Sequence, residues 1–111
     1  MKLSEAILLA ATRWPQCYGL SSCVVDGVER VCPWEGAIRV AGLERTDEEC
    51  RLALLPVSVA CPVCACRIVR LWTLVIHLAD EHRLPFAAVA GLVRKMGVDV
   101  ELAPVAEPAH A

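Results

Sequence analysis

The stretch from Cys61 to His82, CPVCACRIVRLWTLVIHLADEH, is the segment around which this 111-residue chain is organised. Two residues separate Cys61 from Cys64, twelve separate Cys64 from His77, and four separate His77 from His82. Thiolate and imidazole are the ligands that Zn²⁺ takes in structural sites, and this spacing is typical of a tetrahedral one. The sequence therefore predicts that these four residues bind Zn²⁺.

Two apolar residues support a finger-like unit around the metal. Ile68 follows Cys64 by four positions, and Leu74 precedes His77 by three. A finger keeps the residues of its small core at these places, so residues 61–82 resemble the two-Cys two-His zinc finger family. The resemblance implies a ββα unit and a closed, structural metal site.

The spacing of the two histidines predicts an irregular helix. On an α-helix of 3.6 residues per turn, four intervening residues place the side chains about 140° apart, against about 40° for three. Both imidazoles reach one metal only if the last turn widens or unwinds. We therefore expect a π-like or frayed backbone between His77 and His82.

The remaining cysteines allow one competing ligand. Cys66 lies two residues after Cys64 and could replace it, although a small buried side chain is the simpler interpretation. The N-terminal half contains no histidine, so no second metal site is expected there. Four further cysteines are expected to be free thiols, namely Cys17, Cys23, Cys32 and Cys50.

The Cys-Pro-Val-Cys motif also occurs in thiol–disulfide oxidoreductases, which makes redox exchange by Cys61 and Cys64 an alternative function. Such motifs begin a helix, whereas CACRIVR does not read as a clean helix start. A catalytic zinc is not expected either, because four protein ligands leave no open position and the His-Glu-x-x-His order is absent. The sequence therefore favours a protein that is not an enzyme.

DNA binding is the other alternative, because residues 61–96 carry five Lys or Arg against Asp80 and Glu81, a balance of +3. By alignment on His77, the base-reading positions of a finger fall on Arg70, Thr73 and Ile76, and Ile76 cannot read a hydrogen-bonding base edge. A lone finger also spans only about three base pairs. The candidate nucleic-acid contacts are Arg67, Arg70, Thr73, Arg83, Arg94 and Lys95.

The whole chain predicts a mainly α-helical single small domain with a small β component. Hydrophobic residues make up 57% of it, aromatic residues only 5%, and its net charge is −2. We expect residues 1–56 to be an N-terminal helical part, residues 57–97 to hold the finger-like unit and a following helix, and residues 98–111 to be a flexible tail. The sequence contains no run of 18 apolar residues, so we expect no membrane-spanning helix.

Local signals place the elements. Helices are expected from Ser4 as cap to about Arg13, from Pro33 to about Ala41, and from Pro85 to Gly97. A short helix or turn is expected after Thr46 as cap, and a further helix that ends at His82 and starts at Leu71 or at a cap near Thr73. Asp26-Gly27 predicts the two-residue turn of a hairpin ending at Val31. Residues VSVA before Cys61 and RIV after Cys66 are expected to form a strand pair around the cysteine turn.

The chain also resembles a group of small, uncharacterised bacteriophage and prophage proteins. The likeness rests on CPVC, on TLVIHLADEH followed at once by a helix, on LSEAILLAATRWPQ and on CPWEGAIRVAGL. Ala79-Asp80-Glu81 and Leu84-Pro85 depart from the pattern of the group without changing a ligand. The resemblance implies a phage or prophage origin and a helical zinc domain, and it implies no activity.

These observations favour a structural-zinc adaptor that binds another protein, with nucleic acid as the alternative partner. We expect no membrane partner and no small-molecule substrate. The N-terminus has no clear signal-peptide cleavage site, and thiols with zinc suit a reducing compartment. The expected location is the cytoplasm, which is that of the bacterial host if the protein derives from a phage.

Overall fold

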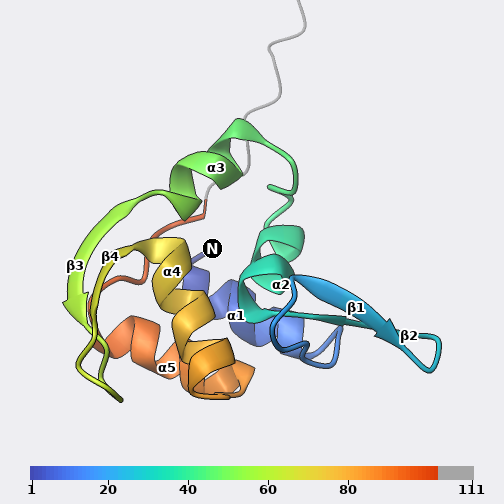
Figure 1. Ribbon diagram of the computed structural model, residues 1–111. Helices are drawn as coiled ribbons and strands as arrows, with labels where there is room; N and C mark the ends of the chain where they lie inside the picture. Colours follow the sequence, from blue (N-terminus) through green and yellow to red (C-terminus); the bar gives the residue numbers. More distant parts are fainter. Residues whose placement is uncertain (103–111) are drawn as a thin grey trace, which may run out of the picture.

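The computed structural model describes residues 1–102, which form one small domain of helices with two small antiparallel sheets (Figure 1). This confirms the predicted mainly α fold class. In chain order the elements are α1 (Leu3–Ala11), β1 (Ser22–Val25), β2 (Val28–Val31), α2 (Pro33–Val40), α3 (Asp47–Ala53), β3 (Pro56–Ala60), β4 (Arg67–Arg70), α4 (Leu71–Ile76), the π-helix η1 (His77–Glu81) and α5 (Phe86–Lys95).

Helix α1 packs against both α2 and α5 and forms one side of the core (Figure 1). Its buried residues recur at the spacing of a helix face, with Leu3, Ile7 and Ala10 fully inaccessible to solvent. Helix α4 packs against α2 and α3, and its Leu71, Leu74 and Val75 join the same core. In the part of the chain that the structure describes, no helix is long and apolar enough to cross a membrane.

The contact between α1 and α2 depends on Gly36. A Cβ at this position would lie 2.7 Å from the Ala10 Cβ and 3.1 Å from a Val31 methyl group. We expect Gly36→Ala to lower the free energy of unfolding by about 1–2 kcal/mol, because overpacking outweighs the better helix propensity of alanine.

Chemical denaturation measures this, with Gly91→Ala in α5 as the matched control. Nothing lies within 4 Å of a Cβ at Gly91, so that variant should gain up to about 1 kcal/mol. Equal shifts in the two variants would contradict the close packing of α1 on α2.

Both predicted strand pairs are present. Asp26 (φ 51°) and Gly27 (φ 78°) form the two-residue turn that joins β1 to β2, with Val25 opposite Val28. Positive φ at both central residues is the backbone that a right-twisted hairpin requires. Strands β3 and β4 pair around the cysteine turn, and β4 runs directly into α4. The order β3–β4–α4 is the ββα unit that the finger resemblance implies.

Three predicted helix starts are correct. Pro33 is the first residue of α2, where the Cys32 sulfur accepts from the Glu35 N–H at 3.3 Å. The Thr46 hydroxyl oxygen caps α3 by accepting from the Glu49 N–H at 3.2 Å. Helix α5 begins directly after Pro85.

The predicted cap at Ser4 and the predicted start of the tail are both wrong. Ser4 lies inside α1 and is buried. Its N–H and its hydroxyl donate to the two carboxylate oxygens of Asp99, at 2.8 and 2.6 Å. The Leu102 N–H donates to the Met1 carbonyl, and the Leu102 side chain is buried. Residues 98–102 therefore belong to the domain, while the rest of the predicted tail, 103–111, lies outside the described residues.

Candidate metal centre

A tight turn between β3 and β4 brings the two cysteines together. The Cys61 N–H donates to the Cys66 carbonyl, and the Ala65 N–H donates back to the Cys61 carbonyl, both at 2.8 Å. Ala65 has a φ of 63°, which reverses the chain within this short segment. Cys61, directly after β3, and Cys64 in the turn thereby face the same point.

The π-helix η1 brings the two histidines together. A π turn closes between residues i and i+5, so His77 and His82 lie on one face of the helix. The ring centroids are 4.7 Å apart and the rings are nearly perpendicular. The predicted π-like backbone between the histidines is therefore confirmed. The intervening Leu78 and Ala79 are fully buried, which fixes the widened turn against the core.

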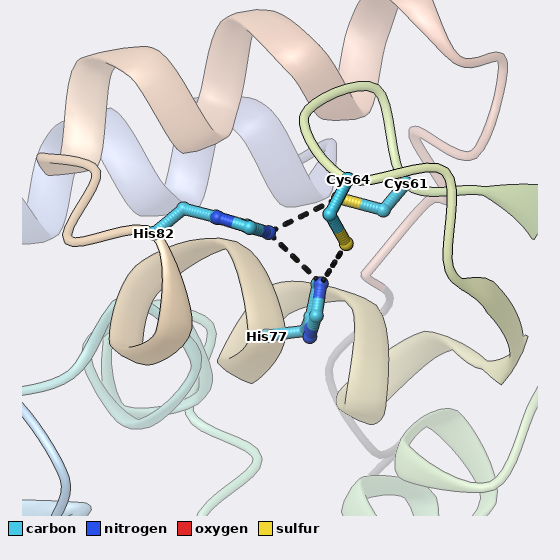
Figure 2. Close-up of side chains that lie close together, drawn as sticks. All are labelled: Cys61, Cys64, His77 and His82. Carbon is cyan, nitrogen blue, oxygen red and sulfur yellow. Dashed lines mark hydrogen bonds between the residues drawn. The ribbon is translucent and has the colours of Figure 1, made fainter.

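The four side chains converge on a common point (Figure 2). Cys61 Sγ lies 3.4 Å from His82 Nε2, Cys64 Sγ lies 3.3 Å from His77 Nε2, and the two Nε2 atoms are 3.0 Å apart. One ligand atom from each residue lies within 4.8 Å of the other three. A tetrahedral centre with bonds of about 2.0–2.3 Å has ligand–ligand edges of roughly 3.3–3.8 Å. The cluster thus has the size and donor set needed to hold one metal ion.

The turn prepares one of the two sulfurs for ligation. Burial alone would raise the pKa of Cys61, but N–H groups of Cys64 and Val63 directed at its sulfur outweigh this and lower the pKa below its usual value. The Val63 N–H lies 3.4 Å from that sulfur. The Cys66 N–H lowers the pKa of Cys64, but desolvation and the neighbouring Cys61 sulfur together raise it. The N–H groups of the turn thus favour the thiolate form of Cys61, which is the form that binds a metal.

The other cysteines do not join this cluster. Cys66 is exposed, so the expected buried side chain is wrong, and its sulfur lies 3.9 Å from the Arg67 carbonyl, outside the four-residue cluster. Within residues 1–102 no second group of metal-ligating side chains is found. Desolvation by burial is the main cause that raises the pKa of Cys17, to about 11, and it also raises the pKa of Cys32.

The candidate nucleic-acid contacts lie on several elements. Arg67 and Arg70 are the two ends of β4, and Arg67 donates to the Ser58 hydroxyl at 2.7 Å. Arg83 lies over the Tyr18 ring at 5.0 Å from its centroid. Arg94 donates to the Ser4 hydroxyl at 2.9 Å and lies 3.9 Å from Asp99. Arg94 thus helps to fix residues 98–102 to α1.

Thr73 lies instead in a surface groove that sequence reasoning did not find. The groove has a volume of about 410 Å³ and follows the outer face of α4 and η1. Its lining residues are Gly19, Trp72, Thr73, Ile76, His77, Asp80 and Glu81. Lys and Arg are absent from this lining, although Thr73 and Ile76 stand at base-reading positions of the finger alignment.

The side chain of Gln16 holds the loop that follows the second histidine. Its Nε2 donates to the Leu84 carbonyl at 2.8 Å, and its Oε1 accepts from the Phe86 N–H at 3.1 Å. This contact joins residues that are distant in the sequence, so no local sequence pattern could have predicted it. We infer that Gln16 positions His82 through the backbone of residues 83–85.

Gln16→Ala should lower the free energy of unfolding by about 1–2 kcal/mol, because two partly buried hydrogen bonds are lost. It should also weaken metal retention against a chelator. Gln16→Glu is the control, since its carboxylate still accepts from the Phe86 N–H but cannot donate to Leu84. An Ala variant with the stability and metal affinity of the parent would contradict this role.

No protein-family model, curated protein or solved structure matches the chain. The predicted phage resemblance therefore has no support beyond the motifs in the sequence. The finger resemblance has structural support in the four-residue cluster itself.

Proposed function

We propose that the protein is a small structural-zinc adaptor that binds another protein through the groove on α4 and η1. Two sulfurs and two imidazole nitrogens suit Zn²⁺, which accepts tetrahedral geometry and needs no redox change. Four protein ligands leave no open position for a substrate, so the metal would stabilise the fold and the protein would not be an enzyme. A phage or prophage origin and a bacterial cytoplasmic location remain predictions from the sequence.

The chemistry of the groove is the observation that supports a protein partner. Trp72, which is 45% exposed, and Ile76 both line the groove. Asp80 and Glu81 supply the charge, and Asp80 Oδ1 is buried without a hydrogen-bond partner. Carboxylates repel a phosphate backbone and attract a cation, and an indole face also binds guanidinium or ammonium groups. The groove therefore fits a protein segment with an Arg or Lys side chain beside an apolar one.

A peptide-array screen tests this function with the zinc-loaded full chain. Peptides that pair Arg or Lys with apolar residues should bind, and acidic counterparts should not. Trp72→Ala should weaken binding at least about tenfold, because a buried aromatic anchor contributes most to such contacts. Val69→Ala is the matched control, since Val69 is exposed on β4 and does not line the groove.

Binding to random duplex DNA at low salt provides the opposing arm of the test. The proposal predicts no measurable binding. Affinity that falls steeply with salt and is unchanged by Trp72→Ala would instead support the DNA-binding alternative.

A further inference from the structure

The segment that leads into the first hairpin holds two cysteines whose sulfur atoms nearly touch. Cys17 Sγ and Cys23 Sγ are 2.9 Å apart. A disulfide bond is about 2.0 Å long, so the two sulfurs would have to approach by less than 1 Å. Both residues lie far from the metal ligands in the sequence, and neither belongs to that cluster.

Both cysteines are fixed to the same strand, which makes their proximity a property of the fold. The Cys17 N–H donates to the Val31 carbonyl at 2.8 Å, and Gln16 forms an isolated bridge with Val31. Cys23 lies in β1 directly opposite Arg30 of β2. Strand β2 therefore holds the backbone on each side of the thiol pair, and the intervening loop does not have to close on its own.

The two thiols differ in access to solvent. Cys17 is 3% exposed, whereas Cys23 is partly exposed. Desolvation, followed by the contact with Cys23, raises the pKa of Cys17 to about 11. Cys23 is therefore the thiol that meets an external oxidant first, and Cys17 is placed to react with it afterwards.

We propose that Cys17 and Cys23 are an oxidation site that closes to an intrachain disulfide on exchange with a low-molecular-weight disulfide such as oxidised glutathione. The Cys23 thiolate attacks one glutathione sulfur, forms a mixed disulfide and releases one glutathione thiolate. Cys17 gives up its proton to solvent and attacks Cys23 Sγ, which releases the second glutathione. Two protein thiols are oxidised and one glutathione disulfide is reduced to two thiols, so atoms and electrons balance.

The bond would close the loop that contains Tyr18 and Gly19. Gly19 lines the groove, and the Tyr18 ring lies against Arg83 in the loop after His82. Oxidation would therefore fix this side of the groove to the hairpin. The disulfide itself does not depend on what binds in the groove.

Tryptic digestion makes the test direct, because residues 14–30, WPQCYGLSSCVVDGVER, form one peptide that holds both cysteines. Cys32, Cys50 and the three cysteines of the metal turn fall in other tryptic peptides. The zinc-loaded protein is equilibrated with a series of glutathione buffers, free thiols are alkylated, and each peptide is weighed. The disulfide makes the 14–30 peptide lighter by two hydrogen atoms than its reduced, unalkylated form.

At fixed reduced glutathione, half-oxidation of this peptide should need at least about tenfold less oxidised glutathione than the half-formed adduct on exposed Cys50, because the second exchange is intramolecular. Cys17→Ser should leave a glutathione adduct on Cys23. Cys23→Ser should leave Cys17 reduced. Because Cys23 is partly exposed, this variant still tests the proposal if Cys17→Ser, at the buried position, fails to fold. A parent peptide that accumulates the adduct at Cys23, or keeps two free thiols while the metal turn oxidises, would overturn the proposal.

Discussion

Replacing His82 by alanine should lower the melting temperature of the domain by more than about 20 °C. A structural zinc contributes roughly 10–16 kcal/mol of apparent binding free energy at neutral pH. That equals or exceeds the total stability of about 5–15 kcal/mol expected of a domain. The loss of one imidazole frees η1 from the turn that holds Cys61 and Cys64. Thermal unfolding followed by circular dichroism, with and without chelator, measures the effect.

The matched control for this ligand variant is Cys66→Ser. Cys66 is exposed beside the ligands, and its sulfur stands outside the cluster. Its replacement should change stability by no more than about 0.5 kcal/mol, as is usual for surface substitutions. A loss of stability in Cys66→Ser as large as that in His82→Ala would show that Cys66 takes part in metal binding, which would contradict the ligand set Cys61, Cys64, His77 and His82.

Leu74→Ala should be the second large effect, with a loss of about 3 kcal/mol and a fall of roughly 10–20 °C in melting temperature. Leu74 is fully buried in the core shared by α4 and its neighbours. Removal of its methyl groups leaves a cavity that the helices around it cannot fill. Chemical denaturation gives the free energy directly.

Thr73→Ala is the comparison for Leu74→Ala on the same helix. Thr73 is exposed, so its truncation should shift stability by about 0.5 kcal/mol or less. The contrast distinguishes a helix held in the core of a domain from one held by zinc alone. If Leu74→Ala were as mild as Thr73→Ala, α4 would owe its position to the metal and not to packing.

Features set by local spacing could be predicted from the sequence. Pro33 and Thr46 start helices because their effects act within one turn. The convergence of Cys61, Cys64, His77 and His82 could be predicted because a short turn and one helix carry them. The π turn could be predicted because a regular α-helix does not bring the side chains of His77 and His82 to one point.

Features set by distant pairing could not be predicted. Ser4 looked like a helix cap, but Asp99 approaches it from the other end of the chain and occupies its N–H and hydroxyl. The contact of Gln16 with Leu84 and the approach of Cys17 to Cys23 depend equally on how the elements pack. Thr73 matched a base-reading position, yet its surroundings are acidic and aromatic because η1 adds Asp80 to the same face.

We propose that Cys61, Cys64, His77 and His82 together hold one Zn²⁺. Metal analysis of the purified full chain, with X-ray absorption at the zinc edge, tests it most directly. We expect one zinc per chain, with two sulfur ligands at about 2.3 Å and two nitrogen ligands at about 2.0–2.1 Å. A chain that holds no stoichiometric metal, and instead forms a reversible Cys61–Cys64 disulfide, would contradict the claim and favour the thiol–disulfide alternative.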